Sequence, residues 1–286
     1  MNQIKSQCPY CGVGCGLEFR AKISEKHDKW LVRGDKENPS TIGKLCIKGA
    51  TVCETLKDGR LTKPLYRKSI KEEFKKITWE KSYEILKEHI DHAVDSYGPD
   101  SIAMYGSGQF HTEDYYMAQK LFKGAIGTNN FDANSRLCMS SAVAGYNKSF
   151  GSDGPPCCYE DIDYCSTILL VGTNTADCHP VLFDRIKKRK KNKSDNLKVI
   201  VIDPRETETA SIADHYLQIA PGTDLFLFLG IANYLCKNNL IEKSFIEKST
   251  DNYDLFEEHI KKWNLKKISK ICNVKEEEII EIAKLW

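Results

Sequence analysis

The chain has 286 residues, of which 41% are hydrophobic and 10% aromatic, so it is long enough for one large or two ordinary globular domains and is not disordered. Its 42 basic and 40 acidic residues leave a formal charge of +2, which excludes a global field that would recruit nucleic acid or an anionic membrane. The longest apolar run, residues 225–232, is too short to span a membrane, and no export signal fits before the first cysteine at position 8. We therefore expect a soluble, cytoplasmic protein whose 12 cysteines stay reduced and indicate metal binding or catalysis before disulfides.

Four cysteines near the N-terminus have the spacing of a metal centre. Three of them share one short stretch with three interspersed glycines, and the fourth is remote: Cys8, Cys11, Cys15 and Cys46. The glycines leave the backbone able to wrap a cluster and to aim N–H groups at its sulfurs. The alternative is a structural zinc site, which usually presents two separate cysteine pairs. The spacing therefore favours a [4Fe-4S] cluster over zinc.

The first part of the chain reads as a small cap domain around these cysteines. We expect short strands over residues 17–23 and 29–33 and a helical segment over residues 44–57. Residues 58–65 contain turn residues and a proline and read as an extended linker. We place the boundary there, with a cluster domain over residues 1–58 and an α/β domain over residues 59–286.

The α/β domain opens with a helix and then a strand followed by a glycine loop. Apolar residues keep helical spacing from 79 to 97, where Gly98 and Pro99 follow. Residues 101–105 form an apolar strand, the loop over 106–109 contains Gly108 and Gln109, and a helix over 112–126 ends at Gly127. Strand, glycine loop and helix is an order that cradles phosphates. Alone, a Gly-x-Gly pair more often marks only a turn.

Two further strands predict a parallel sheet covered by helices. Residues 166–171 lead into Gly172-Thr173-Asn174 and a helix that opens near His179, and residues 197–202 end in Asp203-Pro204-Arg205. Ligands of such sheets bind at the carboxyl ends of the strands, where an acidic side chain can hold a ribose or a guanine edge. No G-x-G-x-x-G motif is present, so an ordinary NAD site is not supported.

The remainder looks helical. Past residues 221–224 the pattern is helical almost throughout, and Asn273 with Glu276 makes a capped start for the last helix. That helix stops at Trp286 without glycine, proline or a polar tail, so we expect the protein to continue into further domains. The basic residues over positions 185–193 lie at the end of a helix, where cations interact favourably with the helix dipole. We prefer this interpretation to a nucleic-acid-binding patch. His179 is more simply a structural histidine at a helix start.

Cys138 precedes a run of small residues over positions 140–145 that is compatible with a helix. A cysteine at a helix start meets the positive end of the backbone dipole, which favours the thiolate that a nucleophile or metal ligand requires. The small side chains after Cys138 leave room for a bulky group to lie close to the backbone. The alternative, a buried and inert thiol, suits most of the other cysteines.

In this order the motifs resemble the molybdenum or tungsten oxidoreductases that carry bis-molybdopterin guanine dinucleotide. The resemblance runs nearly the whole length, beginning with residues 8–16 and Cys46-Ile47-Lys48-Gly49, which look like that family's [4Fe-4S] domain. It implies that Cys138 ligates molybdenum and that Lys48 lies between cluster and pterin. It further implies dinucleotide contacts from Gly108, Gln109, Asn130, Gly172, Asn174, His179, Asp203, Arg205, Gly222 and Asp224.

Within the family, residues 136–145 and 154–161 are most similar to assimilatory nitrate reductases. Formate dehydrogenases typically carry histidine after the metal-bound residue, and this chain has Met139 there. The resemblance therefore implies reduction of nitrate to nitrite, with electrons from a ferredoxin, a flavodoxin or an NADH-oxidising partner. The alternatives are a formate dehydrogenase-like enzyme and a non-catalytic iron-sulfur electron-transfer subunit of the same fold.

Overall fold

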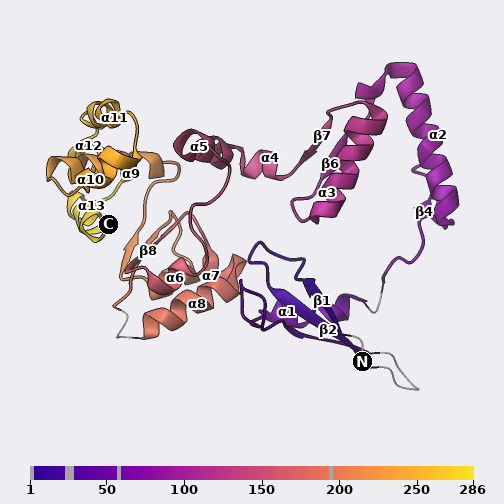
Figure 1. Ribbon diagram of the computed structural model, residues 1–286, viewed down its shortest axis with the longest axis horizontal. Coiled ribbons are helices and arrows are strands. Elements are labelled where there is room, and N and C mark those ends of the chain that lie inside the picture. The colour runs from indigo at the N-terminus through magenta and orange to yellow at the C-terminus, as the bar shows by residue number, and fades with distance from the viewer. Residues whose placement is uncertain (1–2, 23–28, 57–58, 193–195) are drawn as a thin grey trace. The chain divides into compact units, whose positions relative to one another are not determined.

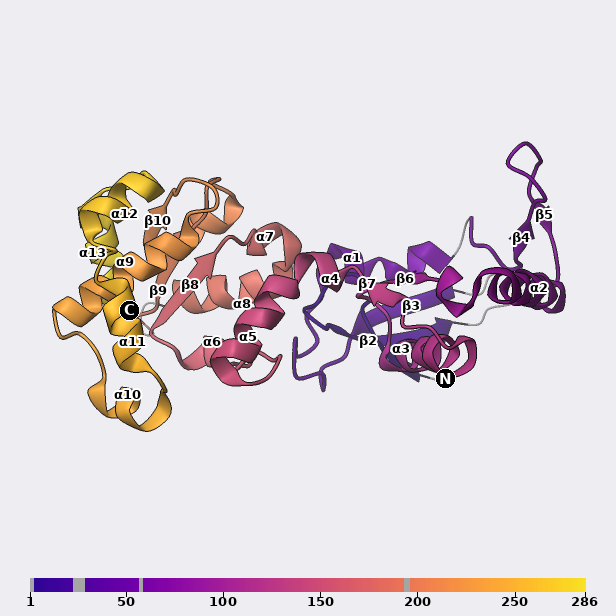
Figure 2. The same ribbon diagram turned by 90° about the horizontal axis from the view of Figure 1, so that it is seen from above.

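The computed structural model describes residues 3–22, 29–56, 59–192 and 196–286 (Figure 1, Figure 2). The chain divides into two compact units, the first made of residues 1–11, 15–37 and 47–156, and the second of residues 12–14, 38–46 and 157–286. Predictions that fell on Ile23, Lys57, Asp58 and Lys193 lie outside the described residues. The domain boundary placed after residue 58 is among them and stays a prediction.

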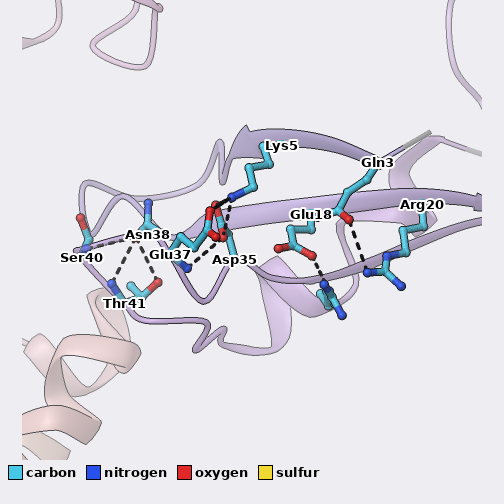
Figure 3. A network of polar contacts seen from close by, with 10 residues as sticks. Gln3, Lys5, Glu18, Arg20, Asp35, Glu37, Asn38, Ser40 and Thr41 are labelled. Atoms are coloured by element: carbon cyan, nitrogen blue, oxygen red, sulfur yellow. Dashed lines mark hydrogen bonds and ion pairs between the residues drawn. The ribbon is translucent and has the colours of Figure 1, made fainter. Parts of the chain in front are cut away.

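The first unit begins with a three-stranded antiparallel sheet in the order β1 (Gln3–Gln7), β2 (Gly16–Lys22) and β3 (Lys29–Gly34). The two predicted strands are confirmed as β2 and β3. β1 is exposed along its whole length and carries no apolar alternation, so the sequence pattern did not reveal it. Ion pairs brace the sheet: Lys5 contacts Asp35 at 3.1 Å (Figure 3), and Arg33 pairs with the buried Glu18.

The helical segment predicted over residues 44–57 is interrupted. The structure has a short α1 (Ile47–Ala50) and a 3-10 helix η1 (Val52–Leu56). The Thr51 hydroxyl between them donates to the Ile47 carbonyl at 2.8 Å, a local bond that competes with regular helix. A small hairpin of β4 (Leu65–Tyr66) and β5 (Lys75–Lys76) follows.

Helix α2 (Trp79–Tyr97) has the predicted bounds. The Thr78 side chain caps its start by accepting from the Lys81 amide at 3.2 Å, and Gly98, with φ 82°, ends it. We expected the next strand to begin at Ser101, but Ser101 is the last residue of a 3-10 turn, η2 (Pro99–Ser101). That strand, β6 (Met104–Gly106), is therefore shorter than predicted and pairs in parallel with β7 (Phe131–Ala133).

The helix predicted over residues 112–126 has the expected extent but is not α-helical throughout. α3 (Thr112–Gln119) passes into a π-helix, η3 (Lys120–Ile126), and Gly127 closes it with φ 85°. α4 (Ser135–Cys138) and α5 (Ser140–Phe150) complete the unit. None of the residues described in α2, α3 and α5 is buried.

The second unit is built on a parallel sheet in the order β10 (His215–Leu217), β9 (Lys198–Ile202) and β8 (Thr167–Val171), as the two apolar runs predicted. The central strand β9 is buried from Val199 to Ile202. On one face Val199 and Val201 pack with Ile186 of α8 (Pro180–Lys191). On the other, Ile200 and Ile202 join the cluster formed by the later helices. Helices therefore cover both faces, as predicted. The short elements α6 (Asp161–Tyr164), α7 (Thr175–Cys178) and η5 (Glu208–Ile212) lie in the connections.

The later helices are α9 (Asp224–Lys237), α10 (Lys243–Ser249), α11 (Tyr253–Ile260), α12 (Leu265–Cys272) and α13 (Glu276–Leu285), shown in orange and yellow in Figure 1. Leu227, Ile268 and Ile279 are fully buried among them. The prediction that Asn273 caps the last helix was wrong. Asn273, with φ 57°, ends α12 instead, and α13 is capped at Lys275, whose amide donates to Glu278 at 2.8 Å. Within the described residues no helix has the length and apolar character that crossing a membrane requires.

Candidate molybdopterin and iron-sulfur site

Three of the four predicted cluster cysteines share one closed loop. The Cys8 amide donates to the Cys15 carbonyl at 2.9 Å, which adds one pair to the end of the β1–β2 ladder and closes residues 8–15 into a turn. Gly14 has φ 75°, a conformation that favours glycine. Cys8 and Cys15 are buried and Cys11 is half-buried. One short loop therefore carries three of the thiols.

The chemistry of these donors fits a [4Fe-4S] cluster, because cysteine thiolates hold such clusters and a tight glycine-containing loop can wrap one. Cys46 is half-buried and belongs to the second compact unit. In the part of the chain that the structure describes, no three or more histidine, cysteine, aspartate or glutamate side chains are grouped so that they could hold a metal ion. The four-cysteine ligand set therefore stays a prediction.

Cys138 is exposed and lies two residues before the small-residue helix α5. Residues 140–145 lie in α5, so the helical character predicted for them is confirmed. Cys138 itself is the last residue of α4, and Met139 separates it from α5. The separate turn forms because Cys138 and Met139 donate their amides to Asn134 and Ser135, at 3.3 Å and 2.8 Å. The thiol is therefore before the helix start, not in its first turn.

Hydrogen bonds join the glycine loop after β6 to two other segments of the first unit. The Gly108 amide donates to the side-chain oxygen of Asn134, the residue before α4. A Cβ at position 108 would lie only 2.9 Å from that oxygen. Gln109 donates from Nε2 to the Tyr10 carbonyl at 3.1 Å, inside the cysteine loop. The glycine loop after β6 thus contacts both the Cys8–Cys11 stretch and the residue that begins the Cys138 turn.

Sequence reasoning did not single out Asn134 for this contact. Its only signal was an asparagine before a helix-compatible run, which equally indicates a cap. Asn130, which it did single out, precedes β7 and donates from Nδ2 to the Asp100 carbonyl at 3.0 Å. Asn130 thus lies at the opposite end of the β6–β7 pair from Gly108. Lys48 is exposed in α1. Roles for Asn130 and Lys48 in cofactor chemistry stay predictions.

In the second unit the predicted dinucleotide residues follow the carboxyl ends of the parallel strands. Val171 pairs with Ile202 and Ile202 with Leu217, so the residues after these strands share one edge of the sheet. Gly172, with φ 57°, donates to the Ile202 carbonyl at 2.9 Å. Asp203 accepts the Arg205 amide at 2.8 Å, which closes the turn after β9. This edge is where ligands of parallel sheets bind.

A small network fixes the loop after β8. The Thr209 hydroxyl donates to Asn174 Oδ1 at 3.2 Å and accepts the Ala176 amide at 3.1 Å. Asn174 donates its Nδ2 to Asp177 at 2.7 Å. Thr209 is fully buried in η5, and nothing in the sequence marked it. Both ends of the Asn174 amide are therefore engaged within the protein.

The remaining predicted contacts lie at helix starts. His179 precedes Pro180 at the start of α8, and its backbone carbonyl accepts the Phe183 amide at 3.0 Å, a bond that does not involve the imidazole. Gly222, with φ 77°, and Asp224, the first residue of α9, begin the helix that follows β10. An acidic residue in a first turn suits the helix dipole. Their contact with a dinucleotide stays a prediction.

Two family models match almost the entire chain. The molybdopterin oxidoreductase Fe4S4 domain matches residues 1–58, and molybdopterin oxidoreductase matches residues 60–279. The chain belongs to the molybdopterin oxidoreductase family. The resemblance drawn from the motifs is confirmed, and with it the predicted cofactor classes, a molybdopterin with molybdenum and a [4Fe-4S] cluster.

Relatives in this family carry more than one activity in their names. A nitrate reductase of Synechocystis is 46% identical over 99% of this chain, and a periplasmic nitrate reductase of Desulfovibrio desulfuricans is 37% identical over 99%. An F420-dependent formate dehydrogenase subunit alpha of Methanocaldococcus jannaschii is 39% identical over 99%. The chain spans 40%, 38% and 40% of the length of these three relatives.

The fold is shared with a solved structure of acetylene hydratase from Pelobacter acetylenicus. The two superpose with a TM-score of 0.83 at 22% identity, over 98% of this chain and 38% of the hydratase. At that identity the likeness concerns the fold alone. It supports the mixed α/β architecture with an N-terminal cluster domain.

Proposed function

We propose that the protein to which this chain belongs reduces nitrate to nitrite. The observation that carries the proposal is the 46% identity, over 99% of the chain, to a relative named nitrate reductase. Met139 supports it, because the formate dehydrogenases of the family that the motifs resemble typically carry histidine there. When bound, the molybdenum cofactor supplies two-electron oxygen-atom transfer, which removes one oxygen from nitrate.

In this proposal the first unit holds the reacting metal. Cys138 donates a soft thiolate to molybdenum from a turn that the structure leaves exposed. Asn134 and Gly108 hold that turn against the glycine loop. The cysteine loop holds the cluster through Cys8, Cys11 and Cys15, with Cys46 as fourth ligand, and Lys48 follows Cys46 by two residues. The positive charge of Lys48 would favour electron transfer from the cluster to the pterin.

The second unit binds the dinucleotide part of the cofactor. Gly172, Asn174, Asp203, Arg205, Gly222 and Asp224 all follow the carboxyl ends of parallel strands or begin the next helix. Gly172 lets backbone approach a phosphate, and the Asp203 carboxylate suits a ribose or guanine edge. His179 and, in the first unit, Gly108, Gln109 and Asn130 complete the predicted contacts. Ligand binding there excludes water from the polar groups that position the cofactor.

We further propose that the protein is cytoplasmic and receives electrons from a ferredoxin, a flavodoxin or an NADH-oxidising subunit. A protein with 12 cysteines keeps its thiols reduced in that compartment. Cell fractionation with an antibody to this chain tests the compartment. Reduction of the purified protein's cluster by each donor in turn, followed by electron paramagnetic resonance, identifies the donor.

A formate dehydrogenase is the second candidate, because one relative with that name is 39% identical over 99% of the chain. Anaerobic assays of the purified full-length protein separate the two. We expect reduced viologen to drive nitrite formation from nitrate, and no reduction of oxidised viologen by formate. Formate oxidation without nitrate reduction would overturn the proposal. Molybdenum analysis separates both enzymes from an electron-transfer subunit without the metal.

The role of Cys138 has a matched control in Cys178, because both thiols are exposed and end short helices. We expect Cys138→Ala to lose at least about 100-fold in nitrate turnover and one metal-sulfur contact in X-ray absorption, as loss of a ligand should. Cys178→Ala should change neither. Wild-type absorption from Cys138→Ala would contradict the assignment.

A further inference from the structure

A cavity of about 460 Å³ lies in the second unit between residues 40–44 and helix α8. Small-ligand pockets span roughly 300–1,000 Å³, so the cavity has the size of a binding site. None of the residues assigned above to the metal or the dinucleotide lines it. The function proposed above therefore assigns no role to this cavity.

The lining of this cavity is strongly cationic. Lys44, Arg185, Lys188 and Arg189 face it, together with one carboxylate, Asp163. Asp163 is already engaged by Arg185, whose Nε donates to Oδ1 at 3.0 Å and whose second nitrogen also reaches the carboxylate. This bond holds the pKa of Asp163 below its ordinary value and raises the pKa of Arg185. With four cationic side chains and one carboxylate, the lining of the cavity carries a net charge of +3.

Two of these charges have no carboxylate of their own. Across the described ranges no ion pair joins Lys44 or Lys188 to an acidic side chain within 4.0 Å. Both side chains belong to exposed residues, so they can turn toward a bound anion. Cations gathered around a concave surface raise the local concentration of anions.

The loop that forms the opposite wall is held in place. Asn38 Oδ1 accepts the amides of Ser40 and Thr41 at 3.1 Å and 3.2 Å, and the Thr41 hydroxyl at 3.4 Å (Figure 3). Thr41 is buried, and Ile42 adopts a left-handed conformation with φ 49°. A wall fixed in this way needs little ordering when a ligand binds.

We propose that this cavity, which we call the α8 anion pocket, binds a small anion carrying two or more negative charges, of the oligophosphate or polycarboxylate class. Lys44 and Lys188 pair with the anionic oxygens, and Arg189 contributes its charge. The concave shape and the apolar Val181 and Leu182 in the lining favour a compact ligand over the flatter surface of an acidic protein.

Isothermal titration of the purified full-length protein at low ionic strength, with pyrophosphate and with citrate, tests the pocket. We expect one saturable site, and the tighter of the two ligands identifies the chemical class. Removing one charge should weaken binding by about fivefold, so Lys44→Ala with Lys188→Ala should weaken it by about 25-fold. Lys188→Arg keeps the charge and should retain the affinity within about twofold.

Lys191→Ala is the matched control, because Lys191 lies on the same helix and carries the same charge but does not line the cavity. It should change the affinity by less than about twofold. An equal loss from Lys191→Ala would show diffuse attraction and overturn the pocket. Failure of both small anions to bind, with poly-glutamate binding in a Lys188-dependent way, would show a protein-docking surface and also overturn it. Nitrate reduction does not enter these measurements, so their failure leaves the proposed function untouched.

Discussion

The two compact units differ in how much of their helical surface they bury. In the second unit, Leu227 of α9, Ile268 of α12 and Ile279 of α13 are fully buried around a parallel sheet. In the first unit, α2, α3 and α5 bury no described residue, and Trp79 and Tyr83 of α2 are more than half exposed. The second unit therefore contains a core of its own, whereas the apolar face of helix α2 in the first is at most half-buried.

The residues proposed for chemistry and for cofactor binding also fall largely in different units. Cys138, Lys48 and the three cysteines of the N-terminal loop belong to the unit with little buried helix, and most predicted dinucleotide contacts belong to the unit with the packed sheet. A binding site built on a rigid sheet edge can hold a large cofactor, while loops supply the reactive groups. Substitutions in each unit should therefore differ in their effect on stability.

The largest expected effect comes from the core of the second unit. Leu227→Ala should lower the free energy of unfolding by about 2–5 kcal/mol, because it leaves a cavity among fully buried side chains. Leu86→Ala in α2 should cost less than about 0.5 kcal/mol, since Leu86 is 54% exposed. Urea unfolding with hydrogen exchange resolved by helix measures both. Equal losses would remove the distinction between the units.

A glycine in each unit gives the next largest effect. A Cβ at Gly230 of α9 would lie 2.8 Å from a side-chain carbon of the buried Ile268, so Gly230→Ala should destabilise the protein by about 1–3 kcal/mol. A Cβ at Gly145 of α5 meets nothing within 4 Å. Gly145→Ala should therefore stabilise α5 by up to about 1 kcal/mol through helix propensity. Thermal unfolding decides, and stabilisation by Gly230→Ala would contradict the packing argument.

The smallest effect depends on pH. Burial raises the pKa of Asp214, but hydrogen bonds from Lys190 and from the Val199 amide, the latter 2.7 Å long, outweigh it and hold the pKa below its ordinary 3.8. A lowered pKa stabilises the folded protein fully above the ordinary value, and this contribution is lost as the pH falls through the folded pKa. Asp214→Asn should cost about 1–2 kcal/mol at pH 7.

As the pH falls below 3.8 and through the lowered pKa of the folded protein, the wild type and Asp214→Asn should converge in urea unfolding, because the carboxylate is protonated first in the unfolded and then in the folded protein. The control is Asp91→Asn in α2, which breaks an exposed ion pair with Lys87 and should cost at most about 0.5 kcal/mol. A loss for Asp214→Asn that stays constant from pH 7 to pH 2 would contradict the linkage.

Long periodic segments were the most predictable from sequence. The spacing of apolar residues in α2 and the unbroken apolar run of β9 led to elements with nearly the predicted bounds. β10 has only three residues and is a strand because it pairs with β9, a tertiary contact that no local pattern contains. Asn273 was assigned to the wrong helix because asparagine suits both a helix start and a left-handed helix end.

The candidate site was predictable where cysteine spacing carried the information. The loop that closes between Cys8 and Cys15 follows from the glycines among the cysteines. Thr209 and Asn134 could not be found in this way, because a buried threonine and an asparagine are common residues whose roles depend on partners 35 and 26 positions away. Such contacts become visible only when the chain is folded.

The contact between Gly108 and Asn134 has an evolutionary consequence. The amide at 108 needs the carbonyl oxygen of the side chain at 134, and that oxygen leaves no room for a Cβ at 108. The two positions are therefore subject to one joint constraint, so substitutions at them should covary among homologues. A lineage that replaces the asparagine loses the penalty on a larger residue at 108, and a lineage that keeps it should keep glycine as well.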